Sequence, residues 1–245
     1  MSARPTSLIE TIGVFRSELR LFDRHVQRLC SAMLACGDRE PLPRDLREQA
    51  EAMVRADRHD VVRIERVLAT SSAPASIAIT TRSRRESPWA RSLDREPVRL
   101  LPVVAQRGTS SPPVEQKALP RTYWDRVLQE ARAGGADDGI ALAPDGALLE
   151  TAVGNLWLLL DSVWTTPPCD APVLPGIARA LLLERAAAVG IPTAERRCEL
   201  SDLHRAEALV VSNAAFGPVQ AVLGPSTAGE CNTSLQRLWR FAVGD

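Results

Sequence analysis

Two hydrophobic periods alternate along the first hundred residues of the chain. Apolar residues at every second position predict strands, whereas apolar residues three and four positions apart predict amphipathic helices. The expected strands cover residues 8–14, 18–22, 61–68, 75–81 and 98–104, and the expected helices cover residues 23–35 and 43–58. Asp23 is the expected N-cap of the first helix. This part of the chain is therefore expected to be mixed, with strands and helices segregated.

A polar stretch containing Gly108 and the Pro112–Pro113 pair interrupts the pattern and predicts a loop or linker. Beyond it, helices are expected at residues 121–133, 177–189 and 235–243, strands at residues 139–142, 155–160, 208–212 and 219–222, and a turn at Pro144-Asp145-Gly146. We therefore expect a small α+β domain over residues 1–106, an interdomain loop over 107–115 and a larger α+β domain over 116–245.

Composition narrows the class of protein. With 245 residues, 45% of them apolar, the chain can bury a large core in one large or two smaller domains. Its formal net charge is zero, which argues against nucleic-acid binding. The first residues show no signal-peptide pattern, and no segment is long and apolar enough for a membrane span. We expect a cytoplasmic protein without a membrane partner.

The cysteines and histidines do not show the spacing of a metal-binding motif. The five cysteines are scattered without a CxxC pair, and the three histidines are equally dispersed. Such cysteines are usually small core residues in a cytosolic protein. We expect no metal site.

Lys117 is the only lysine, although Lys and Arg together number 30. An arginine-rich composition can reflect coding bias, and a single lysine can remain on any surface by chance. Arginine, however, cannot replace lysine as a nucleophile, because only a lysine amine loses its proton readily and forms Schiff bases. The neighbouring motifs decide between these two explanations.

Four other segments carry candidate chemistry. Glu150 ends a short strand and precedes small residues, and Gly176, Ile177 and Ala178 open an apolar helix whose first amides can bind a phosphate. Helical spacing places His25 and Leu29 on one face with Arg28 beside them, so Arg28 can reach inward to an anion. Asn213 with Ala214 lies at the end of an apolar strand. Each segment also has an ordinary structural explanation as a strand end, helix start, solvated arginine or turn.

Taken together, these groups match the needs of pyridoxal phosphate. The lysine forms an imine with the cofactor, and the carboxylate partners the pyridine nitrogen. The arginine and the helix N-terminus hold the phosphate.

The order of the motifs resembles the class IV, or fold-type IV, pyridoxal-phosphate enzymes, which include branched-chain aminotransferases, D-amino-acid aminotransferases and aminodeoxychorismate lyases. The matching segments are LIETIGV, LFDRHVQRL, EQKALPR, APDGALLETAVGNLW, TPPCDAPVLPGIAR and ALVVSNAAFGPVQAV. The resemblance implies a two-domain α+β homodimer of the D-amino-acid aminotransferase type. It also implies that the cofactor lies in the cleft between the domains.

The resemblance assigns a role to each candidate residue. Lys117 corresponds to the Schiff-base lysine, Glu150 to the acid facing the pyridine nitrogen, and Arg28 to the phosphate-binding arginine. Gly176, Ile177 and Ala178 supply helix-terminal amides to the phosphate. Asn213 and Ala214 lie near the phosphate and the substrate carboxylate.

Within the family, two segments favour a lyase that releases 4-aminobenzoate and pyruvate from 4-amino-4-deoxychorismate. Residues 212–217, SNAAFG, and residues 117–121, KALPR, resemble the lyase motifs more than the aminotransferase motifs. A branched-chain or D-amino-acid aminotransferase is the alternative. Pro120 replaces the family's usual asparagine, and Ala178 replaces the threonine that is frequent in aminotransferases.

Family members also carry about one more hairpin's length of chain before the LIET motif. A shortened small domain is therefore expected. This departure motivates a third hypothesis, a catalytically weakened homologue that binds the cofactor or a partner protein.

Overall fold

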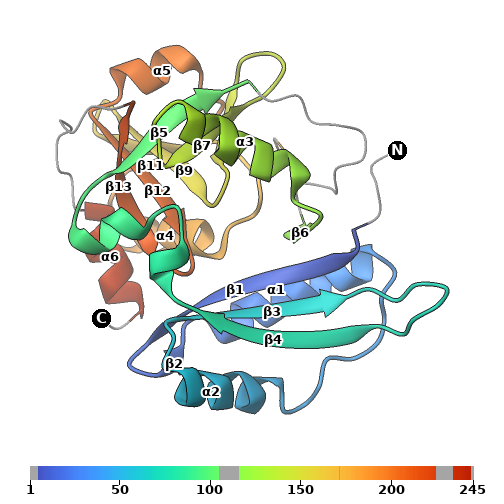
Figure 1. The fold of residues 1–245 in the computed structure, drawn as a ribbon. Helices are drawn as coiled ribbons and strands as arrows, with labels where there is room; N and C mark the ends of the chain where they lie inside the picture. The colour runs from blue at the N-terminus through green and yellow to red at the C-terminus, as the bar shows by residue number, and fades with distance from the viewer. Residues whose placement is uncertain (1–4, 105–115, 171, 225–233, 244–245) are drawn as a thin grey trace. The chain divides into compact units, whose positions relative to one another are not determined.

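The computed structural model describes residues 5–104, 116–170, 172–224 and 234–243 (Figure 1). Internal contacts divide the chain into two compact units. Unit 1 comprises Met1–Glu86 and Gly108–Arg121, and unit 2 comprises Ser87–Arg107 and Thr122–Asp245. Each unit has its own sheet and its own hydrophobic core.

Unit 1 contains a five-stranded antiparallel sheet in the order β2-β1-β3-β4, with β6 paired to β1. Alternate apolar side chains of its strands pack with those of its two helices, so one face of the sheet forms the core with the helices. Its elements are β1 (Ser7–Phe15), β2 (Glu18–Leu19), α1 (Phe22–Ala35), α2 (Leu46–Asp57), β3 (Val61–Val67), β4 (Ser76–Arg82), the 3-10 turn η1 (Arg84–Glu86) and β6 (Ala118–Leu119).

Helix α1 begins earlier than the sequence predicts. Leu21 is the N-cap, with a left-handed backbone at φ 55°, and the buried Phe22 is the first helical residue. The expectation that Asp23 is the N-cap is therefore wrong. Asp23 lies in the first turn instead, where its negative charge still complements the helix dipole. The expected strand at residues 18–22 is correspondingly shortened to β2.

Unit 2 contains an eight-stranded mixed sheet in the order β11-β10-β9-β12-β13-β5-β7-β8. Its strands are β5 (Val98–Val103), β7 (Asp138–Leu142), β8 (Leu148–Thr151), β9 (Asn155–Leu160), β10 (Val163–Thr166), β11 (Thr193–Glu195), β12 (Ala208–Asn213) and β13 (Gly217–Leu223). Its helices are η2 (Ala90–Asp94), α3 (Thr122–Ala133), α4 (Ile177–Ala188), α5 (Leu200–Arg205) and α6 (Ser234–Val243). Strand β9 is buried along its whole length, so it crosses the middle of the core.

The expected domain boundaries place two segments, β5 and residues 117–119, in the wrong unit. Strand β5 pairs in parallel with β13 and β7 and therefore lies inside the unit 2 sheet. Residues 118–119 form β6 on the edge of β1, so Lys117 belongs to unit 1. The expected interdomain loop, residues 107–115, lies outside the described residues.

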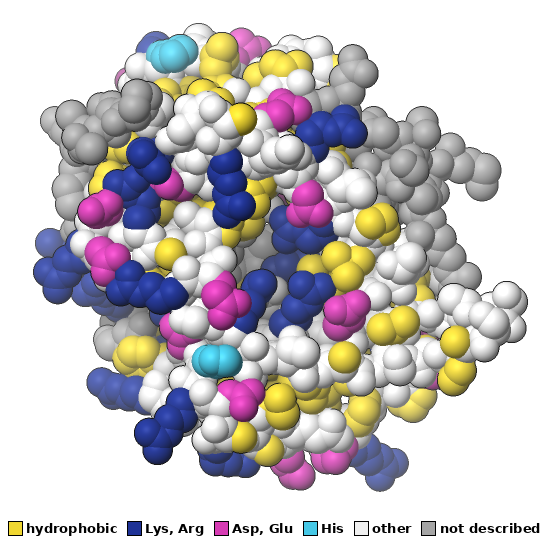
Figure 2. Space-filling view, viewed as in Figure 1, with side chains coloured by type: hydrophobic (Ala, Val, Ile, Leu, Met, Phe, Trp, Pro, Cys, Tyr) yellow, Lys and Arg dark blue, Asp and Glu magenta, His cyan; other side chains and the backbone are white. Residues whose placement is uncertain are grey.

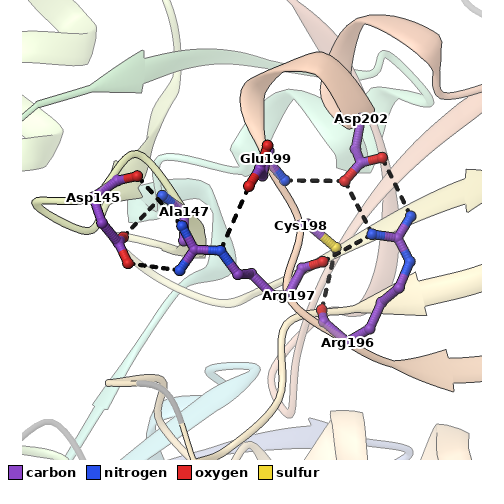
Figure 3. A network of polar contacts seen from close by, with 7 residues as sticks. All are labelled: Asp145, Ala147, Arg196, Arg197, Cys198, Glu199 and Asp202. Carbon is purple, nitrogen blue, oxygen red and sulfur yellow. Dashed lines mark hydrogen bonds and ion pairs between the residues drawn. The ribbon is translucent and has the colours of Figure 1, made fainter.

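The longer expected elements are present, and the turn at Pro144-Asp145-Gly146 is confirmed. Gly146 adopts φ 83°, and its N–H donates to the Ala143 carbonyl at 2.9 Å. The Asp145 carboxylate accepts hydrogen bonds from the Ala147 N–H and from Arg197, which ties the turn to residues 196–202 (Figure 3). The sequence did not predict β10, β11 or α5, each of which is only a few residues long.

Charged side chains of both signs are interspersed over the visible surface (Figure 2). Several form ion pairs, as Arg47 does with Asp23 at 2.7 Å. Among the described helices, none combines the length and apolar character that crossing a membrane requires.

Candidate functional site

Lys117 lies directly before β6, against the central strand of unit 1. Its carbonyl accepts a hydrogen bond from the Ile9 N–H at 2.7 Å, which fixes the lysine backbone on β1. The pKa of the Lys117 amine is lowered to about 7, chiefly by burial and also by the nearby charges of Arg28, Arg121 and Arg82, against the opposing effect of Glu10. A large fraction of the amine is therefore neutral near pH 7, which is the nucleophilic form.

Arg28 reaches inward from its helix, as its position predicts. Within unit 1 it contacts the carboxylate of Glu10. Arg28 Nε donates to Glu10 Oε1 at 2.8 Å, and Arg28 Nη2 donates to Glu10 Oε2 at 2.6 Å. Such a two-bond arrangement fixes the plane of the guanidinium group. Glu10 is 2% exposed, so the pair lies away from bulk water.

His25 completes this cluster from the same helix. Its Nδ1 lies 2.7 Å from Glu10 Oε2, and its Nε2 is buried without a hydrogen-bond partner among the described residues. Burial raises the pKa of Glu10, but the charge of Arg28 and the hydrogen bonds from His25 and Arg28 outweigh it, so the value falls to about 2. Burial lowers the pKa of His25. We assign a neutral His25 that donates its Nδ1–H to an ionised Glu10.

The sequence prediction missed Glu10, although a signal for it was present. In β1, Leu8, Glu10 and Ile12 occupy alternate positions on one face, and all three are buried. A carboxylate within such an apolar period requires a cationic partner. The partner was not identifiable because it lies on a different element.

In unit 2, Glu150 is the penultimate residue of β8 and is 4% exposed. Its Oε1 accepts the Leu174 N–H at 2.9 Å, and its Oε2 accepts the Asn155 Nδ2–H at 3.1 Å. Asn155 Nδ2 also donates to the Leu174 carbonyl at 3.0 Å. Glu150 is therefore a fixed, buried carboxylate rather than a solvated strand end.

Helix α4 starts beside this carboxylate. Gly176 is its N-cap with an extended backbone, and among the described residues no side chain caps this end. A Cβ at Gly176 would lie 1.8 Å from Asn155 Oδ1, so only glycine fits against the asparagine. The first amides of a helix have no intrahelical acceptor, which leaves those of Ile177 and Ala178 available to an anion.

The side chain of Asn213 orders the turn that follows β12. Its Oδ1 accepts the N–H groups of Ala215 and Phe216, both at 3.0 Å, and its Nδ2 donates to the Val153 carbonyl at 3.2 Å. Ala214 lies within this turn. Since Ser212 is paired with Asn155, the sheet register brings the Asn213 turn close to the β8–β9 turn.

Thus unit 1 brings together Lys117 and Arg28, and unit 2 brings together Glu150, the α4 start and Asn213. The first cluster offers a nucleophilic amine in a cationic environment. The second offers a fixed carboxylate and helix-terminal amides. The sequence prediction gave no role to Asn155, although it links Glu150 to the segment before α4.

Comparison with curated proteins finds relatives of two activities. The branched-chain-amino-acid aminotransferase of Escherichia coli K12 is 34% identical over 48% of this chain and 39% of its own length. The aminodeoxychorismate lyase of Bacillus subtilis is 29% identical over 43% of this chain and 38% of its own length. Each alignment spans about two fifths of the relative.

Solved structures share the fold over nearly the whole chain. A Legionella pneumophila protein described as a candidate 4-amino-4-deoxychorismate lyase has a TM-score of 0.82 at 20% identity, covering 98% of this chain and 91% of that one. The T.th. branched-chain amino acid aminotransferase, complexed with N-(5'-phosphopyridoxyl)-L-glutamate, has a TM-score of 0.81 at 19% identity, covering 97% and 83%. The predicted α+β fold of the fold-type IV enzymes is confirmed.

A family model described as amino-transferase class IV matches residues 7–222. This range includes all the candidate residues of both clusters. The chain belongs to the class IV aminotransferase family.

Proposed function

We propose that the chain is a pyridoxal 5'-phosphate enzyme that uses Lys117 to bind the cofactor. Arg28 and the amides of Gly176, Ile177 and Ala178 hold the phosphate, and Glu150 faces the pyridine nitrogen. Asn213 and Ala214 lie near the phosphate and the substrate carboxylate. When bound, this cofactor withdraws electrons from the substrate carbon next to the amine.

The chemistry of the two clusters fits this cofactor. An aldehyde requires a neutral amine, and the pKa of Lys117 near 7 supplies one. A phosphate dianion requires cations and N–H donors, which Arg28 and the α4 start provide. A protonated ring nitrogen requires a fixed acceptor, and Glu150 is held by Leu174 and Asn155. The lowered pKa of Lys117, produced by burial and by neighbouring cations, is the observation that carries the proposal.

Among the reactions of the family, we propose cleavage of 4-amino-4-deoxychorismate to 4-aminobenzoate and pyruvate. Lys117 Nζ accepts a proton from the substrate carbon that bears the amine and returns a proton as the enolpyruvyl ether bond breaks. Glu150 keeps the pyridine nitrogen protonated throughout. The SNAAFG segment, where Asn213 orders the turn, and the resemblance to two lyases support this choice.

A second candidate, an aminotransferase acting on branched-chain or D-amino acids, is favoured by the 34% identity to the Escherichia coli relative. In this reaction Lys117 Nζ would take the proton from the substrate carbon that bears the amine, as in the lyase reaction. The requirements on Arg28 and Glu150 are the same. The two candidates therefore differ in substrate and product and share their cofactor site.

The test is to load purified protein with pyridoxal phosphate, remove the excess and record the absorption spectrum. We expect a visible band that wild type shows and Lys117→Ala and Lys117→Arg lose. Pyruvate release from aminodeoxychorismate without an added 2-oxo acid supports the lyase, whereas conversion of the cofactor to its pyridoxamine form by amino acids supports the aminotransferase. A wild-type protein that retains no cofactor would overturn both.

We also propose that the active form is a homodimer with a small-molecule substrate, as the family resemblance implies. Sedimentation of the cofactor-loaded protein tests this statement. A monomer that turns over substrate at the same rate at all protein concentrations would contradict it.

A further inference from the structure

Asp138, the first residue of β7, is a fully buried carboxylate that the proposed chemistry does not use. Its Oδ2 accepts the Trp89 Nε1–H at 2.8 Å, and its Oδ1 accepts the N–H groups of Gly139 at 2.8 Å and Ala152 at 3.1 Å. The Thr151 side chain is a fourth hydrogen-bond partner. The three N–H groups are donors, and an ionised carboxylate has enough acceptor sites for all of its partners. Burial raises the pKa of Asp138, and these hydrogen bonds oppose the rise.

One of these donors, the Ala152 N–H, belongs to the turn that follows Glu150. Thr151 is the last residue of β8 and Asn155 the first of β9, so residues 151–154 form a turn that Glu150 precedes and Asn155 follows. The Thr151 N–H donates to the Gly154 carbonyl at 2.8 Å and closes the turn. The Ala152 N–H in the middle of the turn is shared by two acceptors of β7, Asp138 Oδ1 and the Gly139 carbonyl, each at 3.1 Å.

Trp89 packs against the other side of the same turn. A Cβ at Gly154 would lie 2.4 Å from the Trp89 ring and 2.5 Å from the Ser212 carbonyl, so glycine permits this close approach. Trp89 is itself fully buried and anchored by its bond to Asp138. Asp138 therefore acts on the turn twice, directly through Ala152 and indirectly through the ring that contacts Gly154.

We propose that Asp138 is a positioning residue that fixes the Glu150 carboxylate for its contact with the pyridine nitrogen, an inference that rests on the proposed function. The link passes from Asp138 through the Ala152 amide to the chain that follows Glu150. Asn155, at the other end of the turn, binds the same carboxylate. Displacement of the turn therefore moves Glu150 relative to its own hydrogen-bond partners.

The readout is the preference of the apo-protein for pyridoxal phosphate over 1-deazapyridoxal phosphate, in which C–H replaces the ring nitrogen. Only the contact at that nitrogen distinguishes the two ligands, so the ratio of their Kd values reports on Glu150. General destabilisation weakens both ligands equally and leaves the ratio unchanged. We expect wild type to prefer pyridoxal phosphate and Glu150→Gln to lose most of this preference.

Asp138→Asn keeps the shape of the side chain but turns an amide N–H either toward the Trp89 N–H or toward the N–H groups of Gly139 and Ala152. In the second case Ala152 keeps only the Gly139 carbonyl as its acceptor. We expect the ratio to fall on the order of tenfold, the effect of losing a hydrogen bond to a charged group. The double variant Asp138→Asn/Trp89→Phe removes the opposing Trp89 donor, and we expect it to regain part of the preference. In Glu150→Gln, adding Asp138→Asn should change the ratio by less than about twofold.

Asp202→Asn is the matched control, because Asp202 is also a buried aspartate of unit 2 but holds the network of residues 196–202 (Figure 3). We expect its ratio to equal that of wild type. If Asp138→Asn does not fold, Trp89→Phe alone should lower the ratio by a smaller factor, because it removes one donor and loosens the contact with Gly154.

The outcomes separate the two levels of the proposal. A Glu150→Gln effect without any effect of the Asp138 or Trp89 variants would overturn the role of Asp138 and leave the proposed function intact. Absence of any preference in wild type would overturn the assignment of Glu150 itself, and with it this inference. Equal losses in Asp138→Asn and Asp202→Asn would show that the ratio follows stability, which also rejects the positioning role.

Discussion

The two clusters of candidate residues are built in different ways. In unit 1, side chains carry the arrangement: a buried carboxylate holds an arginine and a histidine beside a lysine of lowered pKa. In unit 2, close packing against the main chain fixes the Glu150 carboxylate. The carboxylate accepts one backbone N–H and one amide side chain, and the adjacent glycine has no room for a Cβ. The first cluster should therefore be sensitive to changes of charge and the second to changes of shape.

The largest effect on stability is expected for Glu10→Gln in unit 1. The variant leaves the guanidinium of Arg28 buried without its carboxylate, so we expect the free energy of unfolding to fall by about 3 kcal/mol. Denaturant titration at pH 7 measures this change. Glu65→Gln is the control, because its pair with Arg63 is partly exposed and should cost less than about 1 kcal/mol. Equal losses of unfolding free energy in Glu10→Gln and Glu65→Gln would show that the burial of the Glu10 cluster does not add to stability.

Gly176→Ala tests the shape dependence of unit 2. The new Cβ would displace Asn155, whose side chain bonds Glu150 and Leu174, so we expect a loss of about 2 kcal/mol in the free energy of unfolding. Cofactor affinity should also fall. Gly37→Ala should cost about 1 kcal/mol through its backbone angle, with no effect on affinity, because nothing lies within 4 Å of its Cβ. Unchanged affinity in Gly176→Ala would refute the role of the α4 start.

The pH dependence of cofactor capture tests the charge balance around Lys117. The neutral amine is the reactive form, so the rate should rise with pH through a midpoint at about 7 and then level off. Stopped-flow absorbance of apo-protein mixed with pyridoxal phosphate gives this profile. In Glu10→Gln the midpoint should fall, because the Glu10 charge raises the pKa of Lys117. A midpoint near the ordinary lysine value of 10.5 would contradict the cluster.

The smallest effect is expected for Asp202→Asn, away from both clusters. Hydrogen bonds from Arg196 lower the pKa of Asp202, so its stabilising effect is fully present above the unfolded value of 3.8 and is lost as the pH falls below 3.8 toward the lower pKa of the folded state. We expect a loss of about 1 kcal/mol at pH 7, because the partners are largely exposed. Denaturation at pH 7 and at about pH 3 should show the difference narrowing at the lower pH, which lies below the unfolded pKa. A difference that widens at the lower pH would reverse the assigned sign.

Sequence patterns predicted the longer elements and the class of the fold. Periodicity was sufficient for β3 and α3, because their buried positions repeat regularly over five or more residues. Strands β10 and β11 are too short to show a period. The position of β5 depends on pairing with strands distant in the chain, which no local pattern contains.

For the candidate site, the sequence indicated residues with unusual chemistry and could not indicate their partners. Lys117 was conspicuous as the only lysine, and Gly176 as a glycine before a helix. The carboxylate of Glu10 and the amide of Asn155 act on side chains of other elements. Their roles follow from tertiary pairing, which one sequence does not specify.

The parallel placement of β5 between β13 and β7 has a consequence for how the protein is made. A ribosome completes β5 long before β13, so the eight-stranded sheet cannot close until nearly the whole chain has emerged. A fragment that starts at residue 122 would lack a central strand and leave two sheet edges unpaired. Adding a separate peptide that spans residues 96–104 to such a fragment should supply the missing strand, so the polypeptide could be divided there and reassembled from two pieces.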